Sequence, residues 1–220
     1  MTNPSDSSKK TEADSSKKTE ESKKTEDISY NFFYWGPILF KTKLRSEDLE
    51  KCAKLCNKKS TPFNNNLAGV IKHEHEVNAA KLDAILEPYV NAFRLAYLQW
   101  YGEMLIDKII TFKAWANFMV AGEFNPPHRH DKCDFSSVLF VKIPETLKEE
   151  NKNFKGTGAG PGSISFTYGD ARSFSITSKD FFPEEGEFFI FPADLTHFVP
   201  PFLSKGERIS LSANFRLIHV

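Results

Sequence analysis

The sequence lacks an excess of charge of either sign and any long apolar run. Lys and Arg number 29 together, and Asp and Glu also number 29, so the formal net charge is zero. Proteins that bind nucleic acid or anionic membranes are usually basic, and this chain is not. No apolar stretch approaches the roughly 20 residues that a membrane-spanning helix needs. The N-terminus also lacks the apolar centre of a signal peptide. We therefore expect neither a nucleic-acid partner nor a membrane partner.

Cysteine is scarce as well. The three cysteines, Cys52, Cys56 and Cys133, do not have the paired spacing of a disulfide framework. Cys52 and Cys56 lie four residues apart in a helical pattern, which is typical of small apolar core residues. These features favour a reducing, cytoplasmic location.

The first 27 residues contain almost no apolar side chains. The motif SKKTE recurs there at 8–12, 16–20 and 22–26. Such a segment cannot bury enough surface to offset the entropy of ordering, so we predict a disordered tail over 1–27. The tail is either simply solvated or a tether. We expect residues 28–220 to form a single domain.

The domain changes its periodicity near residue 110. Residues 45–110 are predicted to be helical support, with Ser46 as the N-cap of a first helix. A second helical region extends from about Asn78 to Lys108, and Pro88 and Gly102 should break or kink it. A strand is expected at 40–44, and later strand-like segments, separated by turn signals, lie at 111–120, 135–143, 162–169, 186–192 and 208–217. This order predicts an α+β fold in which N-terminal helices pack on a jelly-roll core, a double-stranded β-helix, over 111–220.

The stretch NPPHRHDKCD, residues 125–134, contains the first candidate metal ligands. His128 and His130 stand two apart, so in an extended segment both imidazoles point to the same face. Asp134 lies four residues further on and could supply a carboxylate. His197 follows a later strand and could meet the pair on a rolled sheet. Two nitrogens and one carboxylate on one face describe the metal site of non-haem Fe(II) oxygenases.

A second His-x-His occurs at His73-Glu74-His75. It lies in the charged stretch IKHEHEVN, without any partner signal. We predict that this segment is a solvated part of the surface.

The last strand carries a candidate anion receptor. Arg208 and Ser210 are predicted to share one face, eleven residues or more after His197. A guanidinium donates two parallel hydrogen bonds to a carboxylate, and a neighbouring hydroxyl adds a third. This pair predicts a small acid that is clamped at one end and ligates metal at the other.

The order of these motifs is similar to that of the Fe(II)/2-oxoglutarate-dependent oxygenases. The motifs read W-x-N, P-x-H-x-H, S-x-x-L-F-V, G-x-F-F-I-F-P, H-x-V-P-P and R-I-S-x-S-x-N, and they cover about 115–216. They most resemble the small oxygenases of marine tailed phages, for which the location would be the host cytoplasm. The resemblance implies a double-stranded β-helix, Fe(II), 2-oxoglutarate as co-substrate and ascorbate as an accessory reductant. By motif, His128 and His197 would be metal ligands, Arg208 and Ser210 would hold 2-oxoglutarate, and Asn117 could reach the same acid.

One departure leaves alternatives open. The family pattern is His-x-Asp, but here the third residue is His130, so either the site has three histidines or Asp134 provides the oxygen ligand. We predict a hydroxylase of a protein side chain or a small metabolite, whose primary substrate the sequence does not reveal. A cupin-type metal protein that does not use 2-oxoglutarate is the alternative, since the spacing also resembles the two cupin motifs. A structural jelly roll would need no converging histidines and arginine.

Overall fold

The structure is a computed structural model that describes residues 36–102, 108–170, 172 and 174–218. The described elements lie in the second of two units, Pro37–Val220. The tail predicted at 1–27 lies outside the described residues.

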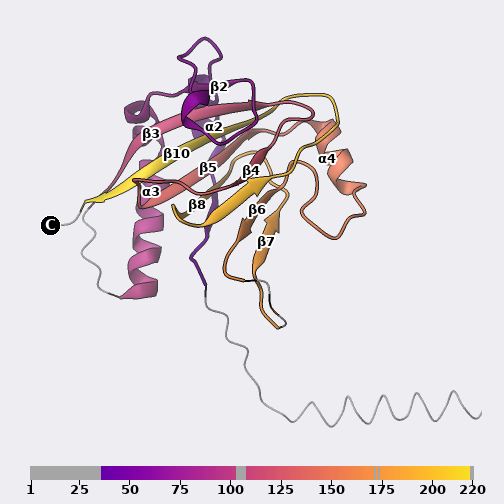
Figure 1. The fold of residues 1–220 in the computed structure, drawn as a ribbon. Helices are drawn as coiled ribbons and strands as arrows, with labels where there is room; N and C mark the ends of the chain where they lie inside the picture. The colour runs from indigo at the N-terminus through magenta and orange to yellow at the C-terminus, as the bar shows by residue number, and fades with distance from the viewer. Residues whose placement is uncertain (1–35, 103–107, 171, 173, 219–220) are drawn as a thin grey trace, which may run out of the picture. The chain divides into compact units, whose positions relative to one another are not determined.

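Within the described residues the core consists of two antiparallel sheets (Figure 1). The major sheet has the order β1-β8-β5-β10-β3-β2, and the minor sheet has the order β4-β9-β6-β7. The strands are β1 (Phe40–Lys43), β2 (Glu74–Glu76), β3 (Lys108–Met119), β4 (Asn125–His128), β5 (Phe135–Lys142), β6 (Ile164–Thr167), β7 (Ser178–Phe181), β8 (Glu187–Pro192), β9 (Thr196–Val199) and β10 (Arg208–Ile218). The predicted α+β fold with a jelly-roll core is confirmed.

Both faces of the major sheet are buried, which explains the dense phenylalanine of its strands. In β8, Phe188 and Ile190 belong to the core that the helices complete, whereas Phe189 and Phe191 belong to the core shared with the minor sheet. The exposed fraction of each of these side chains is 1% or less. Successive side chains of a strand point to opposite faces, so a strand that is covered on both sides reads as a continuous apolar run.

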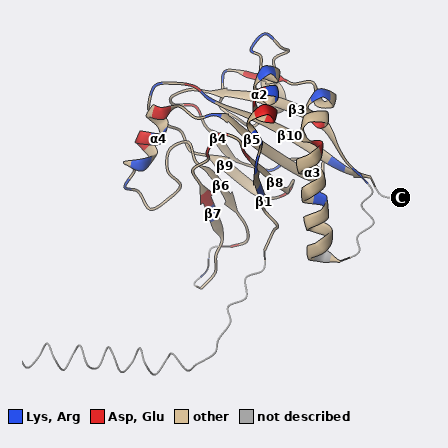
Figure 2. Ribbon diagram, turned by 180° about the vertical axis from the view of Figure 1, so that it is seen from behind, with Lys and Arg blue, Asp and Glu red and all other residues tan. Residues whose placement is uncertain are grey.

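The longer helices cover one face of the major sheet. They are α2 (Ser46–Leu55) and α3 (Ala79–Tyr101), with the short helix η1 (Asn64–Asn66) between them and α4 (Glu145–Lys152) after β5. Charged residues of both signs are mixed on α2 and on α4 (Figure 2). No helix in the described residues is long and apolar enough to cross a membrane.

One sequence expectation about these helices is wrong and one is confirmed in part. Ser46 is the first residue of α2, and Arg45 occupies the N-cap without a capping side chain. Pro88 does not break α3, which continues through it to Tyr101, but Gly102 does end the helix, as its C-cap. The helix starts instead at a capped end, where Asn78 accepts a hydrogen bond from the backbone N–H of Lys81 at 2.9 Å. Burial of its apolar side on the sheet offsets the hydrogen bond that proline cannot make.

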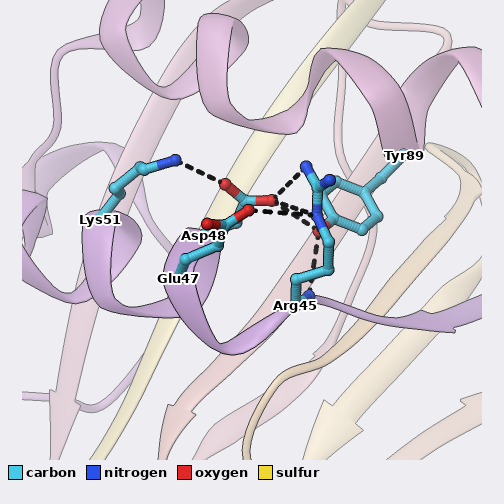
Figure 3. A network of polar contacts seen from close by, with 5 residues as sticks. All are labelled: Arg45, Glu47, Asp48, Lys51 and Tyr89. Carbon is cyan, nitrogen blue, oxygen red and sulfur yellow. Dashed lines mark hydrogen bonds and ion pairs between the residues drawn. The ribbon is translucent and has the colours of Figure 1, made fainter.

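A buried carboxylate joins α2 to α3 (Figure 3). Asp48 is 3% exposed and accepts hydrogen bonds from Lys51 at 2.9 Å and from the Tyr89 hydroxyl at 2.8 Å. The Arg45 guanidinium lies 2.7 Å from the same carboxylate. These donors, Lys51 first, hold the pKa of Asp48 far below its ordinary value.

The segment before residue 110 also contributes strands. β1 pairs with β8, and β2 pairs with β3, so both edges of the major sheet come from the N-terminal part. The predicted solvated surface at 73–75 is therefore wrong: Glu74 is 1% exposed and His75 is 6% exposed. Pairing with β3 buries these residues, and the ring of His75 lies 6.0 Å from that of Phe118.

Candidate active site

Three histidines meet between the sheets. One donor nitrogen from each of His128, His130 and His197 lies within 4.8 Å of the others. His128 ends β4 and is the direct cross-strand partner of His197 in β9, so the ladder turns both side chains to one face. His130 is fixed by its backbone N–H, which donates to the carbonyl oxygen of Ala193 at 2.8 Å. Its Nε2 atom lies 3.2 Å from Nε2 of His197.

The backbone determines which ring nitrogens are free. Nδ1 of His128 donates to the carbonyl oxygen of Pro126 at 2.7 Å, and Nδ1 of His197 donates to that of Leu195 at 2.9 Å. A proton on Nδ1 leaves the lone pair of each ring on Nε2, facing the other histidines. The Nε2 lone pair of His197 accepts a hydrogen bond from Nε2–H of His130 at 3.2 Å, and moving the His130 proton to Nδ1 would give a third lone pair directed at the same point.

Burial keeps these imidazoles neutral. It lowers the pKa of His128, lowers that of His130 to about 3, and lowers that of His197 well below its ordinary value. Neighbouring histidines add to the effect for His130 and His197. Neutral imidazole is the form that binds a metal ion, so the site is prepared for metal at ordinary pH.

Aromatic rings surround the histidines. The ring of Trp115 lies 5.7 Å from that of His130, and Phe63 stacks on Trp115 at 5.8 Å. On the other side the ring of Phe191 lies 4.7 Å from that of His197. This apolar wall explains the desolvation and shields the cluster from water.

The cluster opens into a cavity of about 390 Å³ that also contains Arg208, Ser210 and Asn117 in its wall. Arg208 is 1% exposed. Its Nε and Nη2 atoms have no hydrogen-bond partner among the residues that the structure describes. Its guanidinium carbon lies 4.8 Å from the centre of the Phe140 ring, and Nη1 lies 3.9 Å from the sulfur of Met119.

A buried cation of this kind requires an anion. Burial lowers the pKa of Arg208 to about 10, so the guanidinium still carries its charge at neutral pH. An unpaired buried charge is costly, whereas a carboxylate can accept two parallel hydrogen bonds from the fork. Ser210 stands beside it on the same face of β10, and its hydroxyl oxygen accepts from Nδ2 of Asn117 at 3.3 Å, which leaves the hydroxyl hydrogen free to donate.

The sequence matches the family described as "Putative 2OG-Fe(II) oxygenase" over residues 113–214. That range contains the three histidines, Arg208 and Ser210. Over this range the chain is similar to the 2OG-Fe(II) oxygenases.

Solved structures share the fold of this oxygenase. A prolyl-4-hydroxylase from Pseudomonas putida superposes with a TM-score of 0.54 at 17% identity, covering 81% of this chain and 91% of that one. The viral collagen prolyl hydroxylase of Paramecium bursaria Chlorella virus-1, solved with 2OG, gives 0.52 at 13% identity, covering 82% and 96%. An oxidoreductase of the 2OG-Fe(II) oxygenase family from Burkholderia pseudomallei gives 0.51 at 15% identity, covering 82% and 85%. No curated protein matches the sequence.

The chain is thus a 2-oxoglutarate- and Fe(II)-dependent oxygenase, and its own residues fit both groups. Three neutral nitrogen donors suit a divalent iron, because imidazole is a common ligand for it. The unpaired guanidinium suits the carboxylate of a dicarboxylic acid. A cupin that does not use 2-oxoglutarate would have no need of a buried, unpaired arginine in the same cavity.

The structure separates Asp134 from the other candidate ligands. Asp134 is exposed, and its Oδ2 atom accepts a hydrogen bond from the backbone N–H of Leu217 at 2.8 Å. It belongs neither to the cluster of possible ligands nor to the cavity wall. Asp131 follows His130 directly, so in a regular strand it would point to the opposite face, yet it lines the cavity. The chain leaves the extended conformation just after Asp131, since Lys132 has a φ of 61°, and simple alternation then fails.

Glu74 is a residue of the cavity wall that was not predicted from the sequence. Its buried carboxyl lines the same cavity as the histidines and Arg208. No local pattern marks it, because the five residues between the buried Ile71 and Val77 are all charged or polar.

Proposed function

We propose that His128, His130 and His197 bind Fe(II) through their Nε2 atoms. The support is their convergence within 4.8 Å and the tautomers of His128 and His197, which the carbonyl oxygens of Pro126 and Leu195 fix. The site then has three neutral ligands, where the common pattern has two histidines and a carboxylate.

We further propose that Arg208 and Ser210 hold the distal carboxylate of 2-oxoglutarate. The single observation that carries this assignment is the buried guanidinium, which has two unpaired nitrogens in the wall of the metal cavity. Asn117 then acts indirectly: its Nδ2 atom donates to the hydroxyls of Ser210 and Ser212, each at 3.3 Å, and so orients Ser210.

The reaction is proposed to be hydroxylation of a protein side chain or a small metabolite. When bound, iron and 2-oxoglutarate supply oxidation by O₂, in which one oxygen atom enters 2-oxoglutarate as it loses CO₂ and the other enters the substrate. Arg208 and Ser210 would fix the distal carboxylate and so orient the co-substrate in the cavity. Phe140 and the Trp115 wall exclude water from that space.

The motif order supports a place beside the small oxygenases of marine tailed phages. A cytoplasmic location, the host cytoplasm for a phage protein, agrees with the three free cysteines of the described chain. Two of the similar folds are named prolyl hydroxylases. A prolyl side chain is therefore one reasonable substrate to test.

The test is anaerobic titration of the metal-free protein with Fe(II) and then with 2-oxoglutarate, followed by visible absorption. We expect the charge-transfer band of a chelated keto acid in the wild type, and a much weaker band in Arg208→Ala at the same 2-oxoglutarate concentration. Iron binding without any band would favour the cupin reading. A band of equal affinity in Arg208→Ala would remove Arg208 from the co-substrate site.

A further inference from the structure

Glu74 is a buried carboxyl in the same cavity as the metal cluster. It belongs to β2, the edge strand of the major sheet, and is the direct cross-strand partner of Asn117 in β3. Asn117 in turn pairs with Ser210 of β10. Residues directly opposite one another point to the same face, so Glu74, Asn117 and Ser210 form one row across three strands. Glu74 is 1% exposed and lines the cavity together with the other two.

Few contacts within the protein replace the hydration that the carboxyl of Glu74 loses on burial. Among the described residues, it accepts one hydrogen bond, from the neutral Nδ2 atom of Asn64 at 3.3 Å. No Lys, Arg or His of the described chain forms an ion pair with it. Burial raises the pKa of Glu74 to about 7, with a further contribution from Glu123. Burial therefore favours the neutral acid, and a cation bound beside Glu74 would favour its charged form.

Other hydrogen-bond acceptors gather beside it. Oδ1 of Asn117 is buried and has no partner among the described residues. A Cβ atom at Gly69 would lie 2.5 Å from Oδ1 of Asn125 and 2.8 Å from Oε1 of Glu74, so both oxygens border the space that this glycine leaves open. Asn125 also lines the cavity. Three acceptor groups thus surround one small region of the wall.

We propose that Glu74, with Asn117 and Asn125, binds a protonated nitrogen of the primary substrate, an ammonium or a guanidinium. This inference rests on the proposed function, since it names the substrate class for the same site. An ammonium has three donors and a guanidinium has five, and neither has an acceptor, which complements a pocket of acceptors.

Arg208 and Glu74 would bind opposite charges in the same cavity. Arg208 takes the carboxylate of the co-substrate, and Glu74 takes the cation of the substrate. Three basic residues, Lys113, Arg129 and Lys132, also line the cavity but are exposed. Water screens these exposed charges, so their repulsion of a cation buried beside Glu74 is weak. Together they still attract the dianionic co-substrate towards the cavity.

The test uses the full chain with Fe(II) and 2-oxoglutarate, without O₂, and measures binding by calorimetry. The probes are L-arginine and L-lysine, each free and as the N-acetyl amide, which separates a free amino acid from a residue of a polypeptide. L-citrulline and L-norleucine, in the same two forms, are the counterparts without a side-chain charge. The free forms keep the α-ammonium, so the N-acetyl amides give the comparison without any cation in the neutral member. We expect at least one basic probe to bind about tenfold or more tightly than its neutral counterpart. Glu74→Gln keeps the shape and removes the charge, and we expect it to abolish that preference.

The control is Glu76→Gln, on the same strand, at an exposed residue outside the cavity wall. It should keep the preference. Gly69→Ala should weaken binding of the basic probe severalfold, because the added methyl group displaces the oxygens of Glu74 and Asn125. Thermal unfolding of Glu74→Gln should occur at the same temperature as in the wild type or higher, whereas a purely structural carboxylate would make the variant less stable.

Absence of any preference for a basic probe, or an equal preference in Glu74→Gln, would overturn the inference. The charge-transfer band of the 2-oxoglutarate complex is recorded on the same samples. If the wild type gives no band, the co-substrate assignment has failed, and calorimetry without 2-oxoglutarate still tests Glu74. If the band is intact and the basic probes do not bind, only the substrate class is wrong.

Discussion

Replacing Arg208 with methionine should separate ligand binding from stability. Methionine retains much of the side-chain volume against Phe140 and Met119 but removes the charge. Without its co-substrate, the wild type holds a guanidinium that is 1% exposed and has two unpaired nitrogens. We therefore expect opposite effects on the ligand-free protein and on the complex.

The magnitude follows from the burial. Burial lowers the pKa of Arg208 to about 10, which corresponds to about 3 kcal/mol against the charged form. Loss of the contact with the Phe140 ring offsets about 2 kcal/mol of this. The ligand-free variant should thus be as stable as the wild type or about 1 kcal/mol more stable, which is a rise in Tm of about 2–4 °C.

The complex should show the reverse. At about 100 times its Kd, 2-oxoglutarate should stabilise the wild type by about 2.7 kcal/mol and raise its Tm by roughly 5–10 °C. The variant should show no shift at that concentration. The assay is thermal unfolding with Fe(II) under anaerobic conditions, with and without 2-oxoglutarate.

A matched control lies on the same strand. Arg216 also stacks on a phenylalanine, with its guanidinium carbon 4.4 Å from the centre of the Phe112 ring, but it is exposed and outside the cavity. Arg216→Met should leave the 2-oxoglutarate shift intact. If ligand-free Arg208→Met melts well below the wild type, the buried charge does not destabilise the ligand-free protein. If the variant keeps the full Tm shift with 2-oxoglutarate, Arg208 does not hold the co-substrate.

Further predictions concern the metal cluster and the α2–α3 contact. His130→Ala should lower Fe(II) affinity by about 100-fold or more in a metal titration, and an unchanged affinity would remove His130 from the ligand set. Asp134→Ala should leave that affinity unchanged but lower the free energy of unfolding in urea by about 1 kcal/mol, because the N–H of Leu217 loses its acceptor. The depressed pKa of Asp48 means that its stabilising effect is present above its ordinary pKa of about 4 and is lost as the pH falls further. Asp48→Asn should therefore flatten the loss of stability in acid, and an equally steep loss in both proteins would contradict the role of Lys51 and its neighbours.

The sequence predicted the features that depend on local pattern. The alternation in 208–217 located β10, and the near-continuous apolar run of 186–192 located β8. Both patterns follow from which faces of the strand are buried, so the sequence of the strand alone shows them. Arg208 and Ser210 share a face of β10 as alternation requires, and both line the cavity. The His128–His130 spacing likewise predicted two rings on one side.

Features that depend on distant partners were not predictable in this way. Glu74 reads as a solvated charge until β3 pairs with its strand and buries it. Asp134 has the right residue type for a ligand, but the backbone of Leu217 in β10 takes its carboxylate. Pro88 continues inside α3 because tertiary burial outweighs a local penalty.

The position of β10 has a consequence for the folding rate. β3 and β5 do not pair with each other, and each is joined to the sheet through β10, which follows every other strand along the chain. Until β10 is in place, β2–β3 and β1–β8–β5 are separate pieces with open edges, and the loops that must close are long. Such non-local pairing slows folding and leaves the edges available to other chains. The strand that carries Arg208 and Ser210 is thus also the one that joins the two pieces, so the proposed co-substrate receptor forms only when the major sheet is complete.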